Sequence, residues 1–280
     1  MDEFEKGTRM PALHDHFTLA NGVRLPKVGF GTWQITDERQ AYEATSVALA
    51  SGYRHIDTAR VYGNEASVGR AVRDCGVPRA ELFVASKLPA EIKEHDEALA
   101  SFETTMAAIG LDYVDLYLIH APWPWDAMGQ DCSAGNKAVW KALETVYRSG
   151  RAKAIGVSNF NVTDLCVILD SCAIKPMVNQ IRFFVGNSQT DVVQFCRSED
   201  IQVTGYSPLA TGEILDHPDI NAVAERYGVS VAQICIRYAI QKEVAPLPKS
   251  THAERIRQNA DVDFYLASAD MALLDGLSSS

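Results

Sequence analysis

Four polar side chains with complementary chemistry stand just past the ends of three successive apolar runs of the chain. They are Asp57, Tyr62, Lys87 and His120. If the three runs are neighbouring parallel strands, their carboxyl ends meet at one edge of a sheet and bring these side chains together. A phenol, an ammonium, a carboxylate and an imidazole can together protonate a carbonyl oxygen while another molecule delivers hydride.

The four residue types predict a division of roles. Tyr62 is a poor acid by itself, because the pKa of tyrosine is about 10. The Lys87 cation would lower that pKa by stabilising the phenolate, and Asp57 would keep Lys87 charged and oriented. His120 would orient the substrate oxygen or share in the proton transfer. Taken singly, each residue is more often a solvated charge, a helix cap or a packing residue, so only the combination indicates catalysis.

Short apolar runs that predict strands alternate with helical patterns along the chain. We expect strands at 27–30, 53–56, 82–86, 113–119, 152–157, 177–181, 202–204 and 244–247. The helical patterns fall at 38–51, 65–75, 95–109, 135–149, 162–172, 189–199, 231–241 and from about 253 onward. Two further helices are expected near 217–227 and 268–277.

The alternation of continuous apolar strands with helices predicts a parallel sheet that is buried on both faces. Eight strands and eight helices match the (β/α)8 TIM barrel, an α/β fold of about 250 residues. The doubly wound dinucleotide fold is the competing architecture, but residues 29–34 lack the third glycine of its fingerprint. We expect one domain over 1–280, a flexible extension over 1–16, and an N-terminal hairpin with a two-residue type I′ turn at Asn21-Gly22.

Composition and charge exclude several classes of function. The 280 residues carry a net charge of −10, which argues against nucleic acid or anionic membranes as partners. The six cysteines form no metal-binding pattern and predict reduced thiols rather than disulfides. Neither a signal-peptide core nor a run of about 18 apolar residues is present, so we expect a cytoplasmic protein.

Several stretches, in a common order and spread over nearly the whole chain, resemble the aldo-keto reductase family of the prokaryotic type. The matching stretches are 52–59, 62–65, 110–120, 154–160, 178–180, 205–209, and 248–250 with Arg255 and Asn259. The resemblance implies that Asp57, Tyr62, Lys87 and His120 are the catalytic residues, with Tyr62 as the general acid. Some relatives that act on steroid double bonds carry glutamate at the histidine position, so His120 favours carbonyl reduction.

A local basic site follows the last predicted strand, where a helix begins. The free N–H groups of a helix N-terminus bind anions, and cations beside them strengthen the site. An isolated Lys-Ser…Arg pattern is more often a capped helix with surface cations. The family resemblance reverses that preference and implies that Lys249, Ser250 and Arg255 bind the 2′-phosphate of NADPH, with Gln258 and Asn259 near the adenine.

The resemblance also implies a nicotinamide site at the barrel mouth. Ser158, Asn159 and Gln180 would bind the carboxamide, and Tyr206 would stack on the nicotinamide ring. Without the resemblance, Ser-Asn after a strand would be a helix N-cap and Tyr206 a core aromatic. The other residues expected to contact the cofactor are Gly31, Thr32, Trp33, Asp57, Ser207 and Leu209.

The expected substrate pocket departs from the family pattern. Pro89 and Ala121 occupy positions where many relatives have aromatic residues, and the chain ends at Ser280, soon after its final helix. These differences suggest an open pocket for small or polar carbonyl compounds. Trp123 and Trp125 either line this pocket or simply pack in a long loop. The substrate-contacting residues we expect are Trp33, Tyr62, His120, Trp123 and Trp125.

Three hypotheses for function follow. The first is an NADPH-dependent reductase of aldehydes and ketones that binds a small-molecule carbonyl substrate and works as a monomer. The second is a regulatory or interaction protein that retains a cofactor-binding reductase barrel. The third is a metal-dependent barrel hydrolase, suggested by His14 and His16. Because these histidines precede the hairpin and no acidic cluster completes a metal site, we expect no bound metal.

Overall fold

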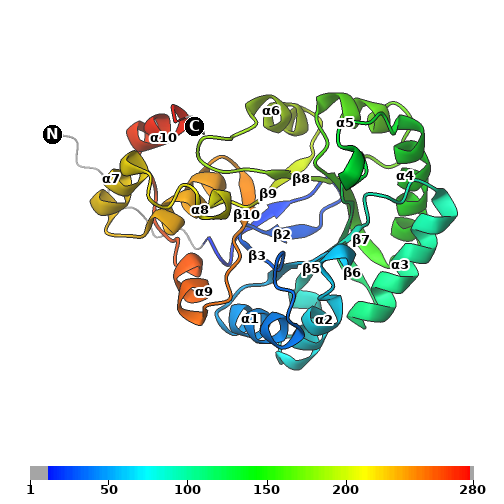
Figure 1. Ribbon diagram of the computed structural model, residues 1–280, viewed down its shortest axis with the longest axis horizontal. Helices are drawn as coiled ribbons and strands as arrows, with labels where there is room; N and C mark the ends of the chain where they lie inside the picture. Colours follow the sequence, from blue (N-terminus) through cyan, green and yellow to red (C-terminus); the bar gives the residue numbers. More distant parts are fainter. Residues whose placement is uncertain (1–11, 278–280) are drawn as a thin grey trace.

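The eight predicted barrel strands form one parallel sheet in the computed structural model, which describes residues 12–277 (Figure 1). Each strand pairs with the next one along the chain, as in a (β/α)8 barrel. The α/β barrel predicted from the sequence is therefore confirmed. The strands are β3 (Gly29–Gly31), β4 (His55–Asp57), β5 (Phe83–Leu88), β6 (Val114–Ile119), β7 (Ala152–Ser158), β8 (Val178–Arg182), β9 (Gln202–Tyr206) and β10 (Val244–Leu247).

The barrel closes where the first strand of the sheet meets the last. The backbone N–H of Gly31 donates a hydrogen bond to the Pro248 carbonyl oxygen at 3.0 Å. Glycine permits this approach, because a Cβ atom on Gly29 would lie 2.5 Å from the side chain of Leu247. The two glycines that fail to complete a dinucleotide fingerprint thus serve closure of the barrel.

Helices surround the barrel on its outer side (Figure 1). The start of the first helix follows from local sequence, since Asp37 caps it by accepting from the backbone N–H of Gln40. The two extra helices predicted from the sequence are present as α7 and α10. The helices among residues 12–277 are α1 (Glu38–Ala50), α2 (Glu65–Asp74), α3 (His95–Ile109), α4 (Ser133–Arg148), α5 (Val162–Leu169), α6 (Thr190–Ser198), α7 (Pro218–Tyr227), α8 (Val231–Gln241), α9 (Ala253–Ala260) and α10 (Ser268–Asp275).

The N-terminal hairpin joins β1 (His16–Thr18) to β2 (Arg24–Pro26), but its turn differs from the prediction. Leu19 N donates to Val23 O at 2.9 Å and Gly22 N donates to Leu19 O at 2.8 Å, which leaves a three-residue loop. Only Gly22 in this loop has a positive φ, whereas a type I′ turn needs two such residues. Asn21 instead donates its side-chain amide to the Lys153 carbonyl oxygen at 2.8 Å. This tertiary contact is the reason that the type I′ prediction is wrong.

The hairpin covers the end of the barrel where the strands begin. Leu19 and Leu25 of the hairpin belong to the same buried cluster as Phe83, Leu116 and Ala154 of the barrel strands. In the view of Figure 1, β2 accordingly crosses the middle of the ring of strands. A second and larger cluster lies between the sheet and the helices. The barrel interior is thus a packed core rather than a channel.

The predicted flexible extension covers residues 1–16, of which 1–11 lie outside the described part of the chain. Ala12 and Leu13 are buried, with exposed fractions of 2% and 8%. The backbone N–H of Ala12 donates to the carboxylate of Asp263 at 2.7 Å. Residues 12–16 therefore pack onto the barrel, with His16 already in a strand.

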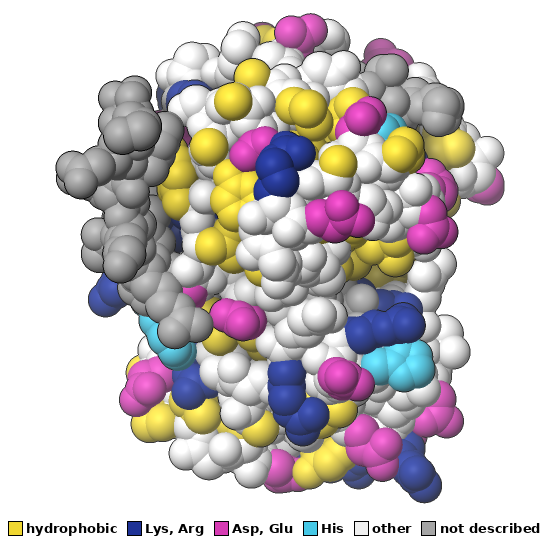
Figure 2. All heavy atoms as spheres, turned by 90° about the vertical axis from the view of Figure 1, so that its left-hand side faces the viewer, with side chains coloured by type: hydrophobic (Ala, Val, Ile, Leu, Met, Phe, Trp, Pro, Cys, Tyr) yellow, Lys and Arg dark blue, Asp and Glu magenta, His cyan; other side chains and the backbone are white. Residues whose placement is uncertain are grey.

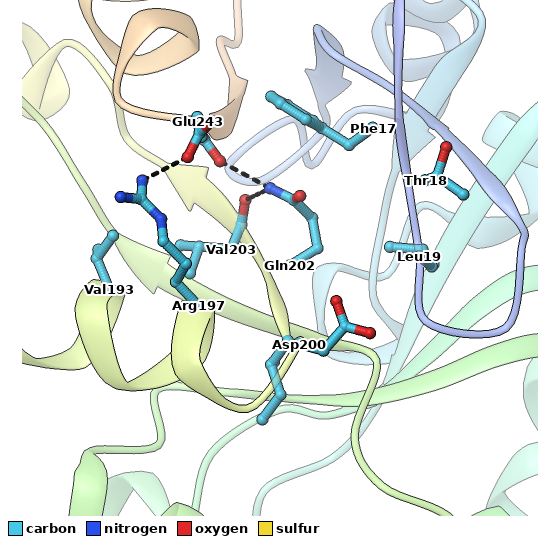
Figure 3. Close-up of a pocket in the computed structure, with 10 residues that line it drawn as sticks. Phe17, Thr18, Leu19, Val193, Arg197, Asp200, Gln202, Val203 and Glu243 are labelled. Carbon is cyan, nitrogen blue, oxygen red and sulfur yellow. Dashed lines mark hydrogen bonds and ion pairs between the residues drawn. The ribbon is translucent and has the colours of Figure 1, made fainter.

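A cavity of about 220 Å³ lies between the hairpin, α6, the start of β9 and Glu243, which precedes β10. Figure 3 shows Arg197 and Glu243 paired at its edge, with a nitrogen–oxygen distance of 2.5 Å. Gln202 donates its amide to the Glu243 carbonyl oxygen at 2.8 Å. This cavity is at the opposite end of the barrel from the carboxyl ends of the strands, where barrel active sites form.

The surface carries mixed charges on the side formed by α7 and α10. Figure 2 shows acidic and basic side chains interspersed there rather than gathered into a basic stripe. All six cysteines are unpaired thiols. None of the helices between residues 12 and 277 has the length and hydropathy needed to cross a membrane.

Candidate active site

A layer of polar side chains closes the barrel interior at its carboxyl end. Side chains along a strand alternate between the two faces of the sheet. On β5, Phe83 and Ala85 belong to the inner apolar cluster, and Lys87 is the next residue on the same face. Likewise, Leu118 of β6 points inward and His120 follows it at the same spacing. The alternation of side chains along β5 and β6 therefore directs Lys87 and His120 into the barrel interior, at its carboxyl end.

The strands extend further than the sequence analysis placed them. Asp57 is the last residue of β4 and pairs with Ala85, and Lys87 lies inside β5, where it pairs with Leu118. Only His120 follows its strand. In β4 and β5, each apolar run ends before its strand does. The backbone hydrogen bonds between neighbouring strands continue past the point where the inward-facing side chains become polar. The prediction that Asp57 and Lys87 lie beyond their strands is therefore wrong by one or two residues.

A buried ion pair forms the base of the site. The Lys87 ammonium donates to Asp57 Oδ1 at 2.6 Å and to the Thr58 carbonyl oxygen at 2.8 Å. The other oxygen of Asp57 accepts from the side-chain amide of Gln180 at 2.9 Å. Lys87 has an exposed fraction of 0% and Asp57 of 3%, so the pair depends on these added hydrogen bonds to offset its desolvation.

Tyr62 lies above the ion pair, in the short 3-10 helix η1 (Arg60–Tyr62) that follows β4. The Lys87 Nζ atom is 5.0 Å from the centroid of the Tyr62 ring. The sequence analysis expected Lys87 to lower the pKa of Tyr62, but burial raises this pKa well above 10, and the carboxylate of Asp57 adds to the rise. The expectation is wrong because burial of the phenol is the largest effect on this pKa. Tyr62 is therefore protonated at neutral pH.

His120 completes the catalytic group as a neutral imidazole. Its ring lies 5.6 Å from the ring of Tyr62, centroid to centroid, in an edge-to-face arrangement. Burial, and then the nearby Lys87 cation, lower the pKa of His120 well below 6.5. Trp125 lies perpendicular to the same histidine ring, with 5.3 Å between centroids. The loop that follows β6 thus contributes an aromatic side chain next to His120.

The side chains expected at the nicotinamide carboxamide form one hydrogen-bonded group. Ser158 donates to the Gln180 carbonyl oxygen at 2.9 Å, and Tyr206 donates to Asn159 Oδ1 at 2.8 Å. Asn159 adopts a left-handed backbone conformation with φ of 63°, which asparagine tolerates better than most residues. Ser158 and Tyr206 are the last residues of β7 and β9, which extend past the predicted strands at 152–157 and 202–204, and Gln180 lies within β8 as predicted.

The loop after β3 approaches the site from the other side. Thr32 is fully buried and donates its hydroxyl to the Asp57 carbonyl oxygen at 3.0 Å, whereas Trp33 is 44% exposed. Asn64 holds this loop, because its amide nitrogen donates to the Thr32 carbonyl oxygen at 2.9 Å and its oxygen accepts from Thr58. The sequence analysis gave Asn64 no role, although its position two residues after Tyr62 was a signal that could have indicated one.

The predicted phosphate site lies at the start of α9. Lys249 and Arg255 are exposed, and neither forms an ion pair with a carboxylate among residues 12–277. Ser250 accepts a hydrogen bond from the backbone N–H of His252, which precedes the helix without capping it. Free cations beside uncapped N–H groups suit an anionic group such as a phosphate. Gln258 is exposed and Asn259 buried on the same helix.

Ser207 and Leu209 belong to the loop after β9, on the same side of the barrel as Tyr206. Ser207 has a φ of 51°, and its carbonyl oxygen accepts from the backbone N–H of Ala210 at 2.9 Å. Both residues are half-buried. Within the described residues, neither side chain forms a hydrogen bond. Both residues are uncharged, so they would contribute to the expected cofactor groove through van der Waals contact.

The arrangement offers a protonated phenol, a neutral imidazole and a buried charge pair at one end of a barrel. A protonated phenol can give a proton to an oxygen that gains negative charge, and a neutral imidazole can donate a hydrogen bond to the same oxygen. The buried ion pair of Lys87 and Asp57 fixes the positions of these two side chains below the phenol and the imidazole. The site can therefore polarise and protonate a carbonyl group.

Comparisons with known proteins agree with this chemistry. The aldo/keto reductase family model matches residues 27–279. The glyoxal reductase of Bacillus subtilis is 41% identical over 95% of this chain and 94% of its own. The glycerol 2-dehydrogenase (NADP(+)) of Saccharomyces cerevisiae is 36% identical over 96% of this chain and 94% of its own.

A solved structure shows the same architecture. The crystal structure of an aldo/keto reductase from Brucella melitensis superposes with a TM-score of 0.87 at 36% sequence identity. It covers 93% of this chain and 98% of its own. The relatives are named as a reductase and a dehydrogenase, which favours an oxidoreductase over a regulatory protein. The family model, the shared sequence and the common barrel show that this chain belongs to the aldo/keto reductase family.

Proposed function

We propose that this protein reduces aldehydes and ketones to alcohols with NADPH, with Tyr62 as the proton donor. The observation that carries the proposal is the edge-to-face contact of Tyr62 and His120 beside the buried Lys87–Asp57 pair. The membership of the chain in the aldo/keto reductase family supports carbonyl reduction as the reaction. The reaction is reversible, so the same residues would serve alcohol oxidation.

Each residue of the group has a separate task in this proposal. The Tyr62 hydroxyl gives its proton to the carbonyl oxygen as negative charge develops there. His120, being neutral, donates a hydrogen bond that orients this oxygen toward Tyr62. Lys87 and Asp57 position the tyrosine, and Lys87 stabilises the phenolate once the proton has left. A bound nicotinamide would supply the hydride, which is the chemistry that the chain itself lacks.

The residues available for the cofactor favour NADPH over NADH. Lys249 and Arg255 are free cations next to Ser250 and the N-terminus of α9, as a 2′-phosphate requires. Ser158, Asn159 and Gln180 would hold the carboxamide, with Tyr206 against the nicotinamide ring. Gly31, Thr32, Trp33, Ser207, Leu209, Gln258 and Asn259 would complete the groove. The name of the yeast relative, which includes NADP(+), is consistent with this preference.

The protein is proposed to act as a monomer in the cytoplasm, as one domain over 1–280. The six unpaired cysteines suit a reducing compartment. Substrate contacts are assigned to Trp33, Tyr62, His120, Trp123 and Trp125. Light scattering of the purified protein at about 31 kDa would agree with the monomer.

The experiment that tests the proposed function is a panel of aldehydes and ketones with initial rates under NADPH and NADH. Turnover with NADPH, at an efficiency well above that with NADH, is expected. Comparable efficiency with NADH would contradict the role given to Lys249 and Arg255. Tight binding of NADPH without turnover of any carbonyl compound would instead favour the regulatory alternative.

A further inference from the structure

Three consecutive backbone carbonyl groups after β6 are each held by a side chain from a different part of the barrel. The donors come from the loop after β7, from the loop after β5 and from α4. The bonds run from Asn159 Nδ2 to His120 O at 2.9 Å, from Lys93 Nζ to Ala121 O at 3.1 Å and from Asn136 Nδ2 to Pro122 O at 2.9 Å. The chain segment that leaves the catalytic histidine is therefore fixed at every residue.

Lys93 and Asn136 form one unit, which we call the loop clamp. The Lys93 ammonium donates to Asn136 Oδ1 at 2.9 Å in addition to its bond with Ala121. Asn136 is 3% exposed, so its polar atoms depend on these partners. A Cβ atom on Gly135 would lie 2.7 Å from the Cβ of Lys93, which means that glycine lets α4 pack closely against the lysine.

The clamped segment leads directly into two tryptophans that face the catalytic histidine. Trp125 packs edge-on against His120, and Trp123 packs against Trp125 with 5.4 Å between ring centroids. Trp125 is nevertheless 39% exposed, so burial alone does not fix its position. The hydrogen bonds of the loop clamp to Ala121 and to the residue that follows it supply this restraint.

We propose that the loop clamp of Lys93 and Asn136 positions Trp125 beside His120 and so gives the enzyme a preference for ring-bearing carbonyl compounds, in contrast to the small or polar compounds that the sequence suggested. This inference rests on the proposed function. Ring-bearing substrates would gain an aromatic contact with Trp125, whereas a short aliphatic aldehyde would reach the catalytic residues without it. The clamp residues are positioning residues, because they do not touch the reacting atoms.

The charge of Lys93 makes the clamp dependent on pH. Burial lowers the pKa of Lys93 to about 8, while Glu91 in the same loop, Cys132 before α4 and Asp164 on α5 raise it in part. Below this pH the ammonium makes charge-assisted hydrogen bonds, which are stronger than those of a neutral amine. The Michaelis constant for a ring-bearing aldehyde should therefore rise above pH 8, and that rise should be absent when Lys93 is replaced.

The test compares Lys93→Met with wild type, using benzaldehyde and propanal as substrates under NADPH. Small displacements of a positioned group can cost up to about 10²-fold in rate, and we expect kcat/KM for benzaldehyde to fall about tenfold through KM. The value for propanal should change less than about twofold. Lys141→Met, an exposed lysine of α4, is the matched control and should behave as wild type. In a Trp125→Ala background, Lys93→Met should have little further effect on benzaldehyde.

Hydrogen exchange gives a second result that does not require turnover. Backbone amides of residues 123–128 should exchange faster in Lys93→Met than in wild type, and equally in the Lys141→Met control. Equal losses for the two aldehydes, or unchanged exchange in this segment, would overturn the loop clamp. Absence of carbonyl turnover by the wild-type protein, with altered exchange in Lys93→Met, would instead refute the proposed function and the substrate preference together.

Discussion

At the scale of single residues, the proposed roles of Tyr62 and His120 predict the pH dependence of catalysis. Burial keeps the pKa of Tyr62 well above 10 and that of His120 well below 6.5, so the phenol stays protonated and the imidazole neutral between these limits. We expect kcat/KM for the reduction of propanal, which does not depend on the loop clamp, to be nearly constant from about pH 6 to pH 9 at saturating NADPH. Alcohol oxidation needs the phenolate and should instead rise with pH over this range. Initial rates in both directions across these pH values check the assignment, and a reduction rate that declines from pH 7 would contradict it.

His55 supplies a separate pH effect, on stability. Its ring is fully buried against Phe83 at the base of the barrel, and burial lowers its pKa from 6.5 to about 4. The unfolded chain therefore binds a proton more readily than the folded chain between these values, and stability falls as pH drops from 6.5 to 4. The full difference corresponds to about 3 kcal/mol in the free energy of unfolding.

The variant His55→Leu removes this titration and keeps an apolar side chain against Phe83. Urea unfolding at pH 7 and pH 4.5 should show a smaller pH-dependent loss in the variant than in wild type. The comparison between the two proteins isolates His55, because the other titrating groups are common to both. Equal losses would mean that His55 is protonated as easily in the folded state as in the unfolded one.

At the scale of secondary-structure elements, the barrel could be predicted from apolar runs and helical patterns, but the strand ends could not. Strands continue through Asp57, Lys87 and Ser158 because main-chain pairing is indifferent to side-chain polarity. Similarly, the hairpin turn depends on a contact between Asn21 and Lys153, which are distant in sequence. Patterns along one segment do not contain such information.

In the candidate site, too, some features could be predicted from the sequence and others could not. The four catalytic residue types stand out in the sequence, and the family resemblance places the cofactor residues on numbered positions. The loop clamp could not be foreseen, because Lys93 and Asn136 are 43 positions apart and neither belongs to a recognisable motif. The pKa of Tyr62 was also out of reach, since its direction depends on how deeply the ring is buried beside Asp57.

The contact between α2 and α3 gives a prediction at this scale. A Cβ atom on Gly69 of α2 would lie 1.8 Å from the carbonyl oxygen of Ile109, the last residue of α3. Gly69→Ala gains about 1 kcal/mol of helix propensity, but the two helices must move apart, and overpacking typically costs about 1–3 kcal/mol. The Ile109 carbonyl belongs to the backbone and cannot rotate away from the new methyl group as a side chain could. We therefore expect the free energy of unfolding, measured with urea, to fall by about 2 kcal/mol.

Gly276→Ala is the control for that substitution. Gly276 has a φ of −79°, and its nearest neighbour to an added Cβ atom is 3.5 Å away. Its free energy of unfolding should therefore stay within about 0.5 kcal/mol of wild type. A Gly69→Ala protein as stable as the control would show that α2 and α3 are not held at the distance described.

At the scale of the whole molecule, the net charge of −10 repels an anionic group such as a phosphate at long range. The proposed binding of NADPH would therefore depend on the local cations at the start of α9. We expect Arg255→Ala to raise the Kd for NADPH about tenfold, because a hydrogen bond to a charged group contributes about 1.5–3 kcal/mol. The Kd for NADH should be unchanged, because NADH has no 2′-phosphate. Arg257→Ala, another exposed arginine of the same helix, should alter neither value. Fluorescence titration measures both constants, and equal weakening of NADPH and NADH would contradict a contact with the 2′-phosphate.

In the proposed reaction the hydride donor, the phenol and the carbonyl substrate meet at the mouth of the barrel, and the central claim is that Tyr62 supplies the proton there. The most direct test is the rate of NADPH oxidation by an aldehyde in wild type and in Tyr62→Phe, with the Kd for NADPH measured in each. Removing a general acid should lower kcat by about 10²–10⁴-fold, with the Kd for NADPH little changed. A Tyr62→Phe protein that binds NADPH normally and still reduces the aldehyde at the wild-type rate would contradict the claim.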